Sequence, residues 1–319
     1  MLLPVFLNNA TDEMIYWTVK FANNYIAEIS TEQGLDLFKT TFSNIFRNYG
    51  VFWTIAFAGI ILLFVIKEFN GHKIFLFVMI LFSFGVVVPG LRFYGHYFLQ
   101  LTPVLSILAA TAFYAFYKIY QRYVSKKSAD IIFLLLFLIV CVTHLNSNNK
   151  YYFRPNHTKV LRDVYGMNPF PEAKVIGDFI KENTNPDDKI AVLGSEPEIY
   201  FYSDRRCVSR HHYITFLMGD TLLFPENKNY QKEYVNDIET NKPKYMVFFN
   251  HPISWLTHPN ASPIINNWFN DYSMKYYNLV GVIDMISPVQ TNYVWYDKIP
   301  TYKPSGKYLI GVFERKEDK

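Results

Sequence analysis

Charged side chains are scarce in this sequence, and neither sign dominates. They make up 18% of the 319 residues, against about 25% in an ordinary soluble domain. The net charge of +4 is small and scattered along the chain. Because a nucleic-acid-binding domain needs a concentrated basic patch, no nucleic-acid partner is predicted.

Cysteines and glycine motifs are nearly absent as well. Cys141 lies in an apolar run and Cys207 in a basic loop, so we do not expect a disulfide, and two thiols make no metal framework. Gly194 follows a predicted strand without the GxGxxG spacing of a dinucleotide site. The sequence therefore predicts no metal and no cofactor.

Hydrophobic residues, in contrast, make up 50% of the chain and aromatic residues 18%. Phe, Leu, Ile and Val dominate up to about Asn149, and the remainder reads like a soluble domain. We therefore predict an all-α membrane region of about four transmembrane helices plus interfacial helices, followed by a small soluble α/β domain. The predicted divisions are residues 1–48, 49–149 and 150–319.

Four apolar runs have the length and composition of membrane spans. A span needs about 20 apolar residues, and these runs are apolar on all sides, which favours a bilayer over the interior of a soluble protein. They indicate a multi-pass membrane protein. The runs cover residues 49–66, 74–91, 97–117 and 130–145.

Lysine and arginine in the short loops predict the orientation, because basic loops stay in the cytoplasm. The loop between the second and third spans carries only Arg92. This asymmetry places residues 1–50 and the C-terminal domain outside the cytoplasm. The basic residues of the other two loops are Lys67, Lys73, Lys118, Arg122, Lys126 and Lys127.

Residues 12–46 predict two amphipathic helices separated by Gly34. Apolar residues recur there at helical spacing, and polar residues occupy the other faces. We interpret them as helices in the membrane interface, with core helices of a soluble cap as the alternative. The apolar positions are Ile15, Thr18, Ala22, Tyr25 and Ile29, then Leu35, Phe38, Phe42, Ile45 and Tyr49.

The pattern alternates between helix and strand from about Pro169, which is typical of a small sheet covered by helices. Strands are predicted at residues 189–193, 245–250, 277–284 and 308–315. Helices are predicted at residues 171–182, 197–202, 227–240 and 263–271.

Two stretches carry a family resemblance: RFYGHYFLQLTP at residues 92–103 and VLGSEPEIYFYSDRRCVSR at residues 192–210. With the order of membrane spans followed by an outer α/β domain, they resemble the C-terminal half of bacterial GT-C glycosyltransferases. Within that group, the chain most resembles proteins that are similar to dolichyl-phosphate-mannose protein mannosyltransferases and aminoarabinose transferases. The resemblance covers nearly the whole chain.

The resemblance implies an enzyme of the plasma (inner) membrane. Such an enzyme moves a sugar from a polyprenyl-phosphate donor to a lipid or glycan acceptor on the outer face of the membrane. Members of this family are longer and carry a catalytic Asp or Asp-Glu pair in their first outer loop. Asp12 and Glu13 precede an interfacial helix instead, so they are not matched to that acid. Catalytic residues stay unassigned, and a truncated or split chain is expected.

Arg92, His96 and Gln100 are the predicted lipid-phosphate site, with Tyr97 beside them. If a helix begins by Arg92, the spacing of four places all three on one face. Ionisable groups at a span end need a partner or a polar cavity, and an arginine fork suits phosphate. The alternative is an interfacial anchor.

A basic loop is a second possible anionic-ligand site. It carries Arg205, Arg206 and Arg210, followed by His211 and His212, and would face anionic head groups or a pyrophosphate-bearing acceptor. We interpret the stretch first as a solvated loop, with the anionic-ligand site as the alternative.

Glu196 and Glu198 flank Pro197 at the start of a short helix. Carboxylates favour a helix N-terminus through the helix dipole, so we interpret both as structural.

A function without catalysis also fits the sequence. In that reading the chain is a membrane protein whose outer domain binds a partner or an envelope polysaccharide.

Overall fold

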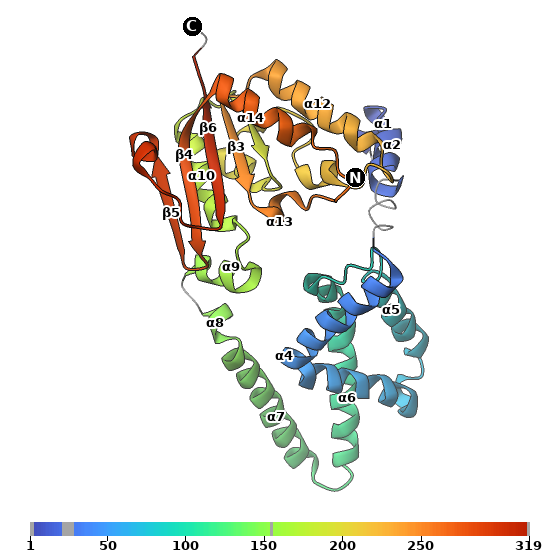
Figure 1. Cartoon of the computed structure of the whole chain (residues 1–319). Coiled ribbons are helices and arrows are strands. Elements are labelled where there is room, and N and C mark those ends of the chain that lie inside the picture. The colour runs from blue at the N-terminus through green and yellow to red at the C-terminus, as the bar shows by residue number, and fades with distance from the viewer. Residues whose placement is uncertain (1–2, 21–28, 154–155, 318–319) are drawn as a thin grey trace. The chain divides into compact units, whose positions relative to one another are not determined.

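The computed structural model describes residues 3–20, 29–153 and 156–317. The chain divides into two compact units, Met1–Asn146 and Ser147–Lys319. The first unit is helical and the second is built on a sheet (Figure 1). This order agrees with the predicted helical region followed by an α/β domain.

The first unit begins with short helical elements: α1 (Leu3–Leu7), α2 (Thr11–Ile15) and a π-helical turn (Tyr16–Lys20). The first predicted amphipathic helix therefore starts where expected. Two of its apolar positions, Ala22 and Tyr25, lie outside the described residues.

Helix α4 (Thr31–Val65) joins two elements that were predicted separately. Ser30 caps its start, and the Ser30 hydroxyl accepts from the Gln33 amide in a capping box. At Tyr49 the backbone leaves helical geometry (φ −129°, ψ 21°). The second amphipathic segment and the first apolar span thus form one helix, with a kink at the predicted boundary.

Three helical segments of the described residues are long and apolar enough to cross a membrane, namely Thr31–Val65, Gly95–Tyr120 and Lys126–Ser147. The second segment consists of the 3-10 helix η3 (Gly95–Leu101) followed by α6 (Thr102–Tyr120). The third segment is α7 (Lys126–Ser147). Helix α5 (Lys73–Gly85) is shorter than the predicted span 74–91. The prediction of an unbroken helix there is wrong, because turns replace it after Gly85.

Helices α4 and α6 lie side by side and run in the same direction. Phe42 is 6.4 Å from Phe98 between ring centroids, and Phe69 is 5.6 Å from Tyr114. The connecting chain must therefore return along α4. It does so from Lys73, whose ammonium donates to the Phe64 carbonyl (3.0 Å), to Leu91, which contacts Gly34.

Small residues permit this close packing. Ala56 and Gly59 of α4 and Ala112 of α6 are buried. A Cβ added at Gly59 would lie 1.9 Å from the Leu108 carbonyl oxygen, so only glycine fits. Such contacts let apolar helices approach where lipid gives no hydrophobic driving force.

We predict that Gly59→Ala destabilises the helical unit. The added Cβ forces α4 and α6 apart, at a cost of roughly 1–3 kcal/mol for an overpacked core. Thermal unfolding of the full chain in detergent measures the effect. Gly85→Ala is the matched control, since a Cβ there meets nothing within 4 Å. Equal midpoints for the two variants would contradict the packing argument.

The second unit contains a six-stranded sheet in the order β2-β1-β3-β6-β4-β5. Strand β1 pairs in parallel with β2 and β3, whereas β6 is antiparallel to β3 and β4. The four predicted strands are confirmed, and β2 and β5 are additional. The bounds are Lys189–Leu193, Arg206–Cys207, Tyr245–Asn250, Tyr277–Ser287, Gln290–Trp295 and Tyr308–Arg315 for β1 to β6.

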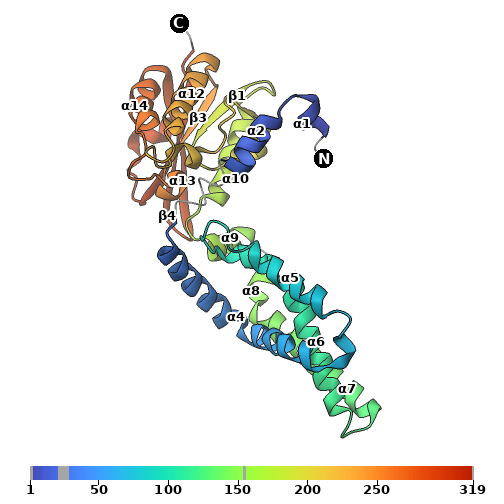
Figure 2. The ribbon, with the colours of Figure 1, turned by 90° about the vertical axis from the view of Figure 1, so that its right-hand side faces the viewer.

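Helices cover both faces of the sheet (Figure 2). Alternation along β3 produces the two cores: Val247 and Phe249 face α10 (Phe170–Glu182) and α11 (Glu198–Ser203), whereas Met246 faces α12 (Glu226–Asn241) and α14 (Ile264–Tyr276). These four helices match the predicted ones. The remaining elements are α8 (Asn149–Tyr152), α9 (His157–Tyr165), α13 (Pro252–Trp255) and the 3-10 helices η2 (Lys67–Phe69), η4 (Ile214–Met218) and η5 (Tyr296–Thr301).

Candidate functional sites

The predicted lipid-phosphate residues begin in a turn of unusual backbone geometry. Gly90 has a φ of 81°, and the non-glycine residues Leu91 and Phe93 have φ values of 49° and 43°. Left-handed conformations cost a non-glycine residue about 1–2 kcal/mol, so packing must hold the turn.

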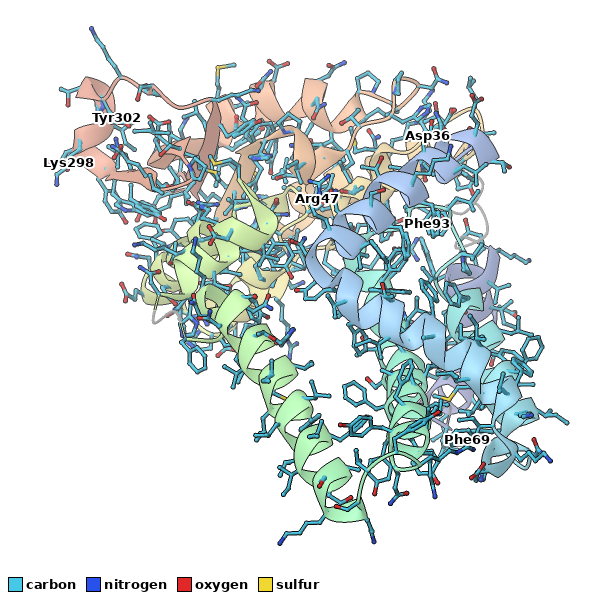
Figure 3. All side chains as sticks on the ribbon, turned by 90° about the horizontal axis from the view of Figure 1, so that it is seen from below. Asp36, Arg47, Phe69, Phe93, Lys298 and Tyr302 are labelled. Carbon is cyan, nitrogen blue, oxygen red and sulfur yellow. The ribbon has the colours of Figure 1, made fainter. Side chains whose placement is uncertain are left out.

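Helix α4 provides that packing. The Phe93 ring is buried and lies 5.2 Å from Phe38 in an edge-to-face contact. Gly34 leaves room for Leu91, because a Cβ at Gly34 would be 2.7 Å from the Leu91 Cβ. Figure 3 shows Phe93 beside α4. The turn around Arg92 is thus held by residues about 60 positions upstream.

The premise that an α-helix begins by Arg92 is wrong. Arg92 precedes η3, and α6 starts only at Thr102. In a 3-10 helix, residues three apart share a face, so the spacing of Arg92, His96 and Gln100 does not give one continuous stripe. Left-handed turns before a helix are not evident from side-chain periodicity.

The four residues still gather in one short segment with mixed exposure. His96 and Gln100 are exposed, whereas Arg92 and Tyr97 are half-buried. The His96 ring lies 4.7 Å from Tyr97 and stacks at 5.7 Å on Tyr94. Polar groups therefore reach the surface immediately before the apolar helix α6.

The basic residues of the predicted loop differ in burial and in hydrogen-bond partners. Arg205 is buried, and its five N–H groups all donate within the protein. The acceptors are the Thr184 hydroxyl (2.8 Å) and the carbonyls of Ser203, Asp204, Lys181 and Thr184 (2.8–3.2 Å). Arg205 thus ties α10 to α11 and keeps no N–H group for a ligand.

Arg210 and His211 share a single carboxylate. The Arg210 guanidinium binds Glu233 through two nitrogens (2.7 and 2.9 Å), and His211 Nε2 lies 3.4 Å from the same side chain. Burial lowers the pKa of His211. Arg206 is exposed, so the three arginines do not converge on one ligand position.

The carboxyl ends of the parallel strands form a site that the sequence reasoning missed. The chain leaves β1 toward α11 on one face of the sheet and leaves β3 toward α14 on the other face. The loops after β1 and β3 therefore diverge, and such a topological switch point is where open α/β sheets bind ligands. Glu196 lies in the connection after β1, and His251 and Ser254 lie in the connection after β3, where Ser254 belongs to α13.

Glu196 is a buried acid at this switch point, with 4% of its surface exposed. The Ser254 hydroxyl donates to its Oε1, and its Oε2 has no hydrogen-bond partner among the described residues. Burial first, and then the nearby Glu198 charge, raises the pKa of Glu196 to about 8. The carboxyl group is therefore neutral at pH 7.

His251 lies close by in sequence to Ser254 and is also buried. Its Nδ1 accepts from the Ile253 amide (3.2 Å), its ring lies 4.0 Å from Tyr308, and burial lowers its pKa. It lines an open cavity of about 640 Å³ with Asn250, Trp255 and Asn266. With Nδ1 bonded to the Ile253 amide, the neutral ring carries its proton on Nε2, so His251 is a hydrogen-bond donor in this arrangement. A neutral acid and a neutral imidazole therefore give this edge two donors.

A buried strand followed by Gly194, Ser195 and Glu196 is the signal that predicts such a site. Instead, Glu196 and Glu198 were read as helix N-terminal carboxylates. A Cβ at Gly194 would lie 2.3 Å from Glu196 Oε2, so the glycine makes room for the buried acid.

Among the described residues, no three His, Cys, Asp or Glu side chains gather to hold an ion. Comparison of the sequence with protein-family models and with curated proteins finds no match.

Glu196 predicts a pH-dependent stability. The folded state keeps its proton up to about pH 8, whereas the unfolded state loses it near the ordinary value of 4.5. The contribution of Glu196 to the free energy of unfolding is fully present below pH 4.5 and is lost as pH rises to about 8. The free energy of unfolding therefore falls by a few kcal/mol over this range. Glu196→Gln should flatten this slope and stabilise the chain at pH 8.

Urea unfolding in detergent between pH 5 and 8, followed by tryptophan fluorescence, measures the slope. Trp255 reports locally because its indole N–H donates to the Phe249 carbonyl (2.6 Å). Glu182→Gln, at an exposed position of α10, should leave the slope unchanged. An identical slope for Glu196→Gln and wild type would refute the assignment.

Proposed function

We propose that this chain forms part of a membrane-embedded glycosyltransferase, which transfers a sugar from a polyprenyl-phosphate donor to an acceptor on the outer face of the membrane. Two motif resemblances support this, at residues 92–103 and 192–210. The observation that carries the proposal is the turn at residues 90–93, which packs against α4. This turn leads into the segment that carries Arg92, His96 and Gln100 immediately before the apolar helix α6.

The proposal includes four membrane crossings, with the second made by the segment 73–91. Helices α4 and α6 point the same way, so a chain that crosses with both must cross back between them. The support is that Lys73 contacts the end of α4 and Leu91 contacts its first half. Loop charges then orient the α/β domain outside the cytoplasm.

Arg92 is the proposed phosphate ligand. Its guanidinium can hold two phosphate oxygens in parallel hydrogen bonds, and the exposed His96 and Gln100 can donate to the remaining oxygens. The isoprenoid chain would lie along the apolar surface of α6. Cationic groups at this position stabilise the lipid phosphate as it leaves the sugar.

Reporter fusions test the topology. Fusions at Gly71 and Ser128 should report the cytoplasm, and a fusion after Lys319 should report the outside. Gly71 suits an insertion because its surroundings are open. An outside signal at Gly71 would reduce the number of crossings to three, and a cytoplasmic signal after Lys319 would overturn the orientation.

Substitution of Arg92 tests the function. Each charge-assisted bond to a desolvated phosphate contributes roughly 1.5–3 kcal/mol, so Arg92→Ala should weaken polyprenyl-phosphate binding about tenfold to a hundredfold. Arg92→Lys should recover only part, because an ammonium lacks the fork. Binding is measured with the full chain in nanodiscs.

Arg47→Ala is the matched control, since Arg47 is an exposed arginine on α4 of the same unit (Figure 3). It should bind like wild type. Equal affinity of wild type and Arg92→Ala would remove the phosphate role and favour a membrane protein whose outer domain binds without catalysis. Full recovery by Arg92→Lys would mark Arg92 as an interfacial anchor.

A further inference from the structure

The carboxyl edge of the sheet carries large apolar side chains at the tips of its loops. We define them as the apolar edge: Leu222 (76% exposed), Leu223 (57%), Ile253 (46%), Leu256 (54%) and Val289 (89%). Single exposed apolar residues are ordinary, but several together mark an interaction site.

These residues share one edge because of the sheet topology. Strands β3 and β4 are both antiparallel to β6, so both end at the same edge. Ile253 and Leu256 follow β3, and Val289 lies in the hairpin after β4. In Figure 1 the β4 arrowhead, α9 and α13 lie at the same end of this unit.

The loop that carries Leu222 and Leu223 is bound to the loop after α13. The Thr221 hydroxyl donates to the Asn260 carbonyl (2.6 Å), and the His258 amide donates to the Met218 carbonyl (2.9 Å). Asp220 accepts from the Leu222 amide (2.7 Å). The two leucines are thus held outward by a defined loop, while the neighbouring Phe224 is buried.

Exposed cations accompany the apolar edge. Lys303 and Lys307 lie in the loop before β6, which Asp284 fixes by accepting from the Tyr302 hydroxyl and from the amides of Ser305 and Gly306 (2.7–2.9 Å). Lys159 lies on α9, which lines a cavity with the β4–β5 hairpin. Apolar loop tips with lysines beside them suit a surface whose interior is apolar and whose outer layer carries negative charge.

The covalent chain brings such a surface within reach. About ten residues separate the end of α7 at Ser147 from the start of α9 at His157, and ten residues span at most about 35 Å. Three exposed aromatic side chains, Tyr151, Tyr152 and Phe153, lie on this connection. Tyrosine side chains prefer the interface between lipid and water.

The opposite edge of the sheet has a different character. It carries Asp187, Asp188, Lys242 and Lys244 around a shallow polar cavity. Exposed apolar side chains at this edge include Met274 (69% exposed), whose carbonyl accepts from Lys316 just after β6, and Phe201 (80%) near the end of α11. The two edges therefore provide matched positions for comparison.

We propose that the apolar edge docks on the surface of the phospholipid bilayer, with its leucines and Val289 among the acyl chains and the lysines at anionic head groups. This inference rests on the membrane insertion contained in the proposed function. It needs neither the glycosyl transfer nor the role of Arg92.

Single-cysteine labelling of the full chain tests the docking. Cys141 and Cys207 are replaced by alanine, and Leu222→Cys, Leu256→Cys and Val289→Cys are labelled with an environment-sensitive fluorophore in nanodiscs of mixed phosphatidylglycerol and phosphatidylcholine. Met274→Cys is the matched exposed position, and Leu135→Cys in α7 reports membrane insertion.

The three edge labels should be quenched by spin-labelled lipid and protected from aqueous iodide, with emission shifted to the blue. The Met274→Cys label should show the reverse. Edge labels that respond like Met274→Cys, while the Leu135→Cys label is quenched by lipid, would overturn the docking and leave the membrane helix intact.

Edge labels shielded from both quenchers would also overturn it, because a protein partner or a second copy would then cover this edge. A Leu135→Cys label that lipid does not quench would reject the membrane part of the proposed function, and the docking with it.

Discussion

The contact between Gly59 and the Leu108 carbonyl fixes the layout of the helical unit. The two apolar helices approach closely at this point and run in the same direction, so the chain between them has to return. Helix α5 covers part of the return, and a turn with left-handed residues completes it before α6 begins. The position of Arg92 follows from this packing and not from a helix of its own.

Local patterns in the sequence predicted the elements that local forces stabilise. The helix 171–182 buries residues at helical spacing, and the strand 189–193 is a short apolar run that is buried on both sides. Both are present with nearly the predicted bounds. The apolar runs also identified three long helices. The kink at Tyr49 coincides with the change from amphipathic to fully apolar sequence, so that boundary was readable too.

Features that depend on contacts between residues far apart in the sequence could not be predicted. The turn at Leu91 and Phe93 adopts a conformation that L-residues avoid, and only Gly34 and Phe38 of α4 explain it. Arg205 looked like a solvated cation, yet Thr184 and its neighbours take all its donors. Glu196 matched a helix N-terminus, but its burial depends on Ser254, 58 residues away.

The carboxyl edge of the sheet combines a neutral acid with apolar loop tips, and one physical setting accounts for both. Glu196 stays protonated because water is excluded around it. A bilayer against Leu222 and Leu256 would exclude water from the same edge and lower the dielectric there, which disfavours ionised carboxylates. Docking and the neutral state of Glu196 would therefore reinforce each other.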